Sequence, residues 1–112
     1  MRFDARDLTD YSEPVSAIDI ELGATYYSVT FADTDMMVPV IVTIIFIGEL
    51  ASGNLRFQDA MSHQFGITPE TVSEDNPATF YECAKDQLRS IFTFEKCLET
   101  LMRCSMRRNG GG

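Results

Sequence analysis

The sequence contains no tryptophan, a single histidine and only three cysteines among its 112 residues. An odd number of cysteines without a Cys-X-X-Cys spacing argues against a disulfide framework and predicts a reducing, cytoplasmic compartment. No second histidine or close cysteine pair completes the ligand set of a metal site. Cys97 and Cys104 instead have a spacing that suits packing on one face of a helix. The sequence therefore predicts no metal and no cofactor.

Motifs of catalysis and targeting are also missing. The chain has no glycine-rich phosphate loop, no Gly-X-Ser-X-Gly elbow and no Ser–His–Asp arrangement. Its longest apolar run stops at Gly48, well short of the ~20 residues that cross a bilayer. The start of the chain mixes acids and bases without an apolar core, so no signal peptide is expected. These absences favour a non-enzymatic protein outside the membrane.

Positive charge is scarce, because nine Lys and Arg face seventeen Asp and Glu, giving a net charge of −8. Such a charge opposes binding to nucleic acid and to anionic membranes, so neither is predicted as a partner. Residues 1–35 carry eight acidic and two basic side chains. This acidic region keeps the domain soluble or, as the alternative, docks onto a basic protein partner.

The main apolar stretch runs from Met37 to Leu50 and predicts the central strand of a sheet, over about residues 37–48. Its β-branched side chains suit a pleated strand better than a helix. Apolar side chains alternate on both sides of the stretch, so we expect the strand to be buried on both faces. Pro39 fits a strand start or an exposed edge, because proline has no N–H group to donate.

Two shorter segments of alternating polarity flank this strand. Residues 25–33 and residues 55–59 each place apolar side chains on one side of an extended chain. Turn-forming residues at 33–35 and 51–54 join both segments to the central strand. Such short connections predict antiparallel neighbours, so the three strands form a meander.

Three further segments have weaker signals. Residues 16–19, followed by Gly23, favour a single helical turn with Ser16 as its N-cap, with a short strand as the alternative. Residues 68–70 (Thr-Pro-Glu) have the signature of a brief helix. Residues 79–84 favour a fourth strand over the start of a helix, because the segment is aromatic and lacks good helix formers.

The C-terminal part predicts an amphipathic helix over about residues 93–108, with Thr93 as its N-cap. Glu99 and Arg103 are four residues apart and are expected to form an ion pair on its surface. We therefore expect residues 1–112 to form a single α+β domain, an antiparallel β-meander of three to five strands packed on one C-terminal helix. A loosely attached acidic arm over about residues 1–15 and a flexible glycine tail at 110–112 complete the chain.

One helix covers only one face of such a sheet, whereas the central strand is apolar on both. The side chains expected on the uncovered face are Ile41, Thr43, Ile45 and Ile47. An exposed apolar face of this kind usually marks an interaction site. We therefore predict a homodimer with these four residues at its interface; cover by the 60–92 segment, or closure of the sheet into a small barrel, is the alternative.

The leading functional prediction is a non-enzymatic, bacterial-type cytosolic domain that associates with itself and with a basic protein partner, as an immunity protein or antagonist does. The alternative is a small-molecule-binding domain or minor enzyme with a pocket beside the 59–80 loop. Its candidate residues are Arg56 for a ligand and Asp59 with His63 for catalysis, because an Asp–His pair can act as a general base. Asp59 and His63 share a face only if residues 59–63 are helical.

Overall fold

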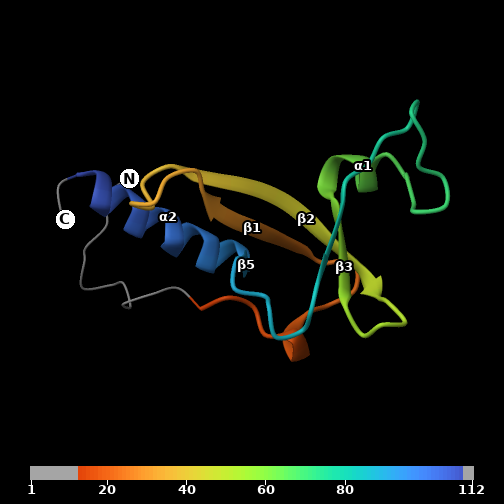
Figure 1. Cartoon of the computed structure of the whole chain (residues 1–112), viewed down its shortest axis with the longest axis horizontal. Coiled ribbons are helices and arrows are strands. Elements are labelled where there is room, and N and C mark those ends of the chain that lie inside the picture. Colours follow the sequence, from red (N-terminus) through yellow and green to blue (C-terminus); the bar gives the residue numbers. More distant parts are fainter. Residues whose placement is uncertain (1–12, 110–112) are drawn as a thin grey trace.

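The computed structural model describes residues 13–109 of the chain (Figure 1). In chain order its elements are η2 (Ala17–Asp19), β1 (Thr25–Phe31), β2 (Pro39–Glu49), β3 (Leu55–Asp59), α1 (Ala60–Gln64), β4 (Phe80–Cys83), β5 (Ile91–Phe92) and α2 (Phe94–Arg108). The strands form one antiparallel sheet in the order β4-β3-β2-β1-β5, so the predicted α+β meander on a C-terminal helix is confirmed. Most of the predicted N-terminal arm and the whole glycine tail lie outside the described residues.

β1 and β2 form a long hairpin, as their alternating sequences predict, with Thr25 opposite Ile45. Asp33 holds the turn between the two strands. Its carboxylate accepts hydrogen bonds from the backbone N–H groups of Val38 at 2.8 Å and Met37 at 3.0 Å. These bonds lower the pKa of Asp33, because they stabilise the charged form of its carboxyl group.

β2 is the central strand of the sheet, but only its second half is enclosed. β3 pairs with β2 from Ile44 onwards and ends at Asp59, where the chain turns into α1. Residues 44–46 are buried, whereas Val40 and Ile41 are 44% and 43% exposed. The prediction that the central strand is buried on both faces is therefore wrong for its first half, because β3 is too short to lie beside it.

The two faces of the sheet are covered by different parts of the chain. The larger buried cluster consists of Tyr26, Ile44, Phe46, Leu55, Phe57, Leu88 and Ile91. Side chains from residues 15–24 pack against this cluster together with Leu88, so the chain itself covers the face away from α2. The register places Ile41 opposite Val29, on the face that carries α2. The prediction that Ile41 lies on the face opposite the helix is therefore wrong.

α2 lies over β1 and β5 on one side of the sheet (Figure 1). Its start is fixed by Thr93, which confirms the predicted N-cap. Cys97 packs with Val29 and Phe92 in a second buried cluster. Because the helix covers only the β1 side of the sheet, its apolar stripe is not fully buried, and Phe94 is 55% exposed.

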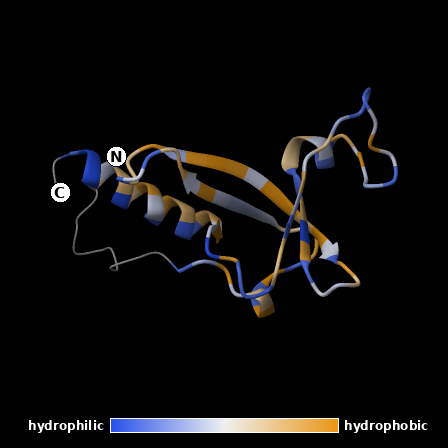
Figure 2. Cartoon of the chain, in the orientation of Figure 1, coloured by the Kyte–Doolittle hydropathy of each residue, from blue (hydrophilic) through white to orange (hydrophobic). Residues whose placement is uncertain are grey.

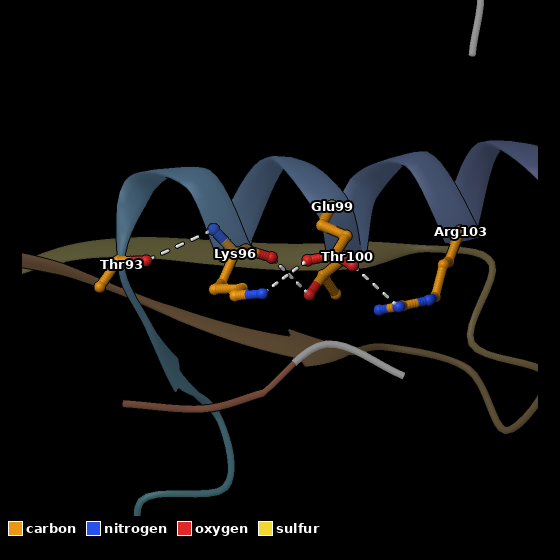
Figure 3. A network of polar contacts seen from close by, with 5 residues as sticks. All are labelled: Thr93, Lys96, Glu99, Thr100 and Arg103. Atoms are coloured by element: carbon orange, nitrogen blue, oxygen red, sulfur yellow. Dashed lines mark hydrogen bonds and ion pairs between the residues drawn. The ribbon is translucent and has the colours of Figure 1, made fainter. Parts of the chain in front are cut away.

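A polar network lies along the flank of α2 (Figure 3). The Glu99 carboxylate bridges Lys96 at 3.3 Å and Arg103 at 3.1 Å, and the Thr100 hydroxyl donates to the Lys96 carbonyl at 2.9 Å. The side chains of Glu99 and Arg103 are only 15% and 13% exposed. The predicted Glu99–Arg103 pair is therefore confirmed, and it is better shielded from solvent than an ordinary helix-surface pair.

The predictions for the short elements are partly confirmed. The brief helix predicted at residues 68–70 is wrong: this segment is a turn, and the helix α1 that sequence analysis misses lies at residues 60–64. β4 confirms the strand predicted at residues 79–84. η2 confirms the helical turn at residues 16–19, although the Ser16 side chain makes no capping hydrogen bond.

Candidate functional site

A cavity of about 440 Å³ lies where the end of β2 meets β3, α1 and the loop that follows α1. This volume is within the ordinary range of small-molecule sites. Apolar side chains of Ile47, Leu50, Ile67 and Pro69 form part of its wall. The polar lining side chains are those of Glu49, Arg56, Gln58, His63, Thr68 and Glu70.

Arg56 and His63, both candidate residues from the sequence, line this cavity together. Arg56 is on β3, and its guanidinium lies 4.8 Å from the centre of the Phe80 ring. No carboxylate within residues 13–109 forms an ion pair with Arg56, whereas Glu49 at the cavity is paired with Lys85. Stacking on an aromatic ring leaves the guanidinium N–H groups able to bind an anionic group.

Asp59, predicted to act with His63, does not line the same cavity as His63 but a neighbouring depression. Its carboxylate accepts hydrogen bonds from the Ser62 N–H at 2.9 Å, the Ser62 hydroxyl at 2.6 Å and the Thr79 N–H at 2.8 Å. Partial burial raises the pKa of Asp59, but these bonds outweigh it and the net pKa is lowered. Asp59 is thus the N-cap of α1, and it makes no hydrogen bond to His63 within the described chain.

A buried glutamine beside the cavity is missed by sequence analysis. Gln58 is 1% exposed, and its Nε2 group donates to the Ser62 hydroxyl at 2.8 Å and to the Ile67 carbonyl at 2.7 Å. Nothing among the described residues donates to its Oε1 atom, and Gln58 lines the cavity. The alternation of β3 identifies Gln58 as a polar residue on one face, but only the packing of α1 shows that this face is covered.

The four residues predicted for a dimer interface occupy different environments. Ile41 is 43% exposed, and Thr43 is also exposed. Ile45 is buried, with 8% of its surface accessible. Ile47 is half-buried and lines the cavity. Only Ile41 and Thr43 are therefore accessible to a second molecule.

Exposed apolar side chains surround the turn of the β1–β2 hairpin and the first half of β2. This hairpin surface consists of Met36, Met37, Val38, Val40 and Ile41, which are between 37% and 51% exposed. Val40 and Ile41 lie on opposite faces of β2, so the hairpin surface includes both faces at this end of the sheet. Figure 2 shows that strong hydrophobicity continues along β2 to this end of the sheet. No charged residue lies between Asp35 and Glu49. The five side chains of the hairpin surface are apolar and uncharged, and two charged groups border them: the Arg107 guanidinium donates to the Met36 carbonyl, and the Asp33 carboxylate accepts from Met37 and Val38.

Within residues 13–109, the His, Cys, Asp and Glu side chains form no group of three that could hold a metal ion. No helix in this described range combines the length and hydrophobicity needed to cross a bilayer. No protein-family model matches the sequence, and neither a curated protein nor a solved structure matches it significantly.

Proposed function

We propose that this protein is an association domain and that the hairpin surface is its contact region. The supporting observation is the clustering of five exposed apolar side chains in one uncharged segment of a chain whose net charge is −8. Contiguous exposed apolar regions on soluble proteins usually mark interaction sites. Covering such side chains is favourable by about 25 cal/mol per Å² of apolar surface removed from water.

The partner in this proposal is a second copy of the chain. Two-fold symmetric dimers are the commonest homo-oligomers, and in them the same surface of each subunit forms the interface. The hairpin surface contributes no charged side chain of its own to the contact, although Asp33 and Asp35 lie in the turn beside it. A basic protein partner would be recognised through acidic side chains outside this surface and is a separate prediction.

The mass of the protein in solution tests this proposal. Sedimentation equilibrium should give twice the chain mass of 12.6 kDa. Ile41→Lys places a charge in the contact region and should return the protein to one chain mass. Ile18→Lys is the matched control, because this isoleucine is 89% exposed on η2, away from the hairpin surface. A single chain mass for the unsubstituted protein at high concentration would contradict the proposal.

The cavity supports a second candidate function, the binding of a small molecule that carries a carboxylate. Arg56 provides a guanidinium without an ion-pair partner among residues 13–109. Planar guanidinium groups bind carboxylates through two parallel hydrogen bonds. The Oε1 atom of Gln58 and the ring of His63 provide further polar contacts for the same molecule.

Thermal unfolding with a panel of mono- and dicarboxylates tests this second function. A ligand present at 100 times its dissociation constant should stabilise the folded protein by about 2.7 kcal/mol. Arg56→Gln and His63→Ala should reduce this gain. Arg89→Gln is the control, since Arg89 is exposed and outside the cavity lining. If no carboxylate raises the unfolding temperature, the cavity does not bind this class.

A further inference from the structure

We infer that two copies join edge to edge, by antiparallel pairing of the first halves of their β2 strands; this rests on the self-association proposed above. β1 pairs with β2 along residues 39–45, whereas β3 pairs with β2 only from Ile44 onwards. No strand of the described chain lies beside residues 39–43 on the β3 side. The side of residues 39–43 that faces away from β1 therefore has no strand neighbour and forms an open edge of the sheet. At one end of this edge, α1 follows β3 and contacts β2.

The ladder between β1 and β2 shows which backbone groups face this open edge. The Val38 carbonyl accepts a hydrogen bond from the Ala32 N–H at 2.9 Å, so even-numbered residues in this part of β2 face β1. Backbone groups of successive residues point to opposite sides of an antiparallel strand. Ile41 and Thr43 thus direct their N–H groups to the open edge. Pro39 lies on the same side, where its missing N–H costs no bond to β1.

The length of the open edge determines the register of the pairing. Residues from Ile44 onwards are next to β3, so only residues 39–43 of each copy can meet. These stretches overlap fully when Ile41 lies opposite the partner's Ile41. The two Ile41 residues then exchange N–H to carbonyl hydrogen bonds, and the Thr43 N–H donates to the carbonyl of the partner's Pro39. This register satisfies every N–H group of the open edge.

The open edge has few of the features that protect most sheet edges from pairing. Edge strands are usually blunted by charged side chains, especially Lys, by proline or by bulges. Residues 39–43 contain Pro39 at one end but no charged side chain, and the irregularity in β2 lies beyond them, between Phe46 and Gly48. Unprotected backbone groups flanked by β-branched apolar side chains therefore favour another strand as the occupant.

A second copy supplies that strand, and it also covers exposed apolar side chains outside the paired residues. The two-fold axis through Ile41 directs the hairpin turn of each copy towards the partner's β3 end, where α1 begins. Met36 and Met37 are exposed at the turn, and Met61 in α1 is 71% exposed. The turn of each copy, with its exposed methionines, thus points towards the partner's α1 at both ends of the pair.

Disulfide trapping of the full chain tests this geometry with Ile41→Cys and Thr43→Cys. Both side chains are exposed on the same face of β2, so each variant should fold. In the inferred register, the Cα atoms of the two residues 41 are about 5.5 Å apart, within the disulfide range of roughly 4.4–6.8 Å. The two residues 43 are offset by four positions, or about 13 Å, which is beyond reach.

Mild oxidation should convert Ile41→Cys to a linked dimer on a non-reducing gel, at least about tenfold more than Thr43→Cys. The unsubstituted chain gives the background from its native thiols, two of which, Cys97 and Cys104, are buried. A doubled mass without linkage at position 41, or with stronger linkage at position 43, would overturn the edge pairing and leave self-association intact. A single chain mass for the unsubstituted protein would overturn both.

Discussion

Removing the carboxylate of Asp59 should destabilise the fold by about 2–4 kcal/mol, because one side chain anchors both α1 and the approach to β4. Loss of an N-cap costs ~1 kcal/mol, and each hydrogen bond to a charged group contributes about 1.5–3 kcal/mol. Asp59 makes the capping bond to the Ser62 N–H and two further bonds, at 2.6 Å to the Ser62 hydroxyl and 2.8 Å to the Thr79 N–H. Water replaces part of this contribution in Asp59→Ala, because Asp59 is only half-buried.

The pH dependence of stability separates the charge of Asp59 from its shape. Its pKa is lower in the folded protein than in the unfolded chain, so its ionisation stabilises the fold above the unfolded pKa of about 3.9. This contribution is lost as the pH falls through the folded pKa. Asp59→Asn keeps the shape without the charge. It should therefore be less stable than the unsubstituted protein at neutral pH, and the difference should shrink below about pH 4.

Urea unfolding followed by far-ultraviolet circular dichroism measures both effects, since the chain has no tryptophan. Asp75→Asn is the matched control: Asp75 is exposed in the loop before β4, and its substitution should change stability by less than about 0.5 kcal/mol. Equal stability of Asp59→Ala and the unsubstituted protein at neutral pH would refute the capping role. A constant difference between Asp59→Asn and the unsubstituted protein at every pH would refute the role of its charge.

Phe57→Ala should lower the free energy of unfolding by about 3–5 kcal/mol, because this ring is 1% exposed and contacts Tyr26 and Phe46; urea unfolding measures the change. Raising the NaCl concentration from about 0.05 to 0.5 M should leave the mass of the proposed dimer unchanged, because the side chains of the hairpin surface carry no charge, and dissociation would indicate a contact between charges. Cys97 should resist iodoacetamide at neutral pH, because burial raises the pKa of its thiol; rapid alkylation detected by mass spectrometry would contradict its buried position between α2 and the sheet.

The long elements could be predicted from the sequence because their periodicity extends over several residues. Alternation along β1 and β2, with turn residues between them, is sufficient to predict the hairpin, and Asp33 performs the turn role expected of its residue type. The C-terminal helix has both a capping residue and an apolar stripe. In each case the interactions that form the element are local in the sequence.

The remaining elements depend on contacts between distant residues. β5 contains two residues and forms because Phe92 lies beside Tyr27 of β1. α1 has one local signal: Asp59 is followed three residues later by Ser62, whose N–H group it caps. Nothing in the local sequence, however, shows that β3 ends at Asp59. The cavity also depends on residues that are distant in the sequence. Arg56 and His63 could be predicted as candidate residues from their chemistry, whereas the burial of Gln58 could not, because it depends on the loop at Ile67 packing over β3.

The central strand β2 has more apolar residues than its neighbours cover, because β2 is longer than β3. β2 spans residues 39–49, whereas β3 pairs only with its second half, so apolar residues of β2 extend beyond the neighbour that would cover them. The sequence pattern indicates this excess and predicts it on a face of the sheet, whereas the strand register places it at an edge. The distinction matters for the kind of partner, because a face requires a packed layer of side chains, whereas an edge also requires backbone hydrogen bonds. An identical strand meets that requirement, so replacing the N–H group of Ile41 should weaken association more than trimming an exposed side chain such as Val40.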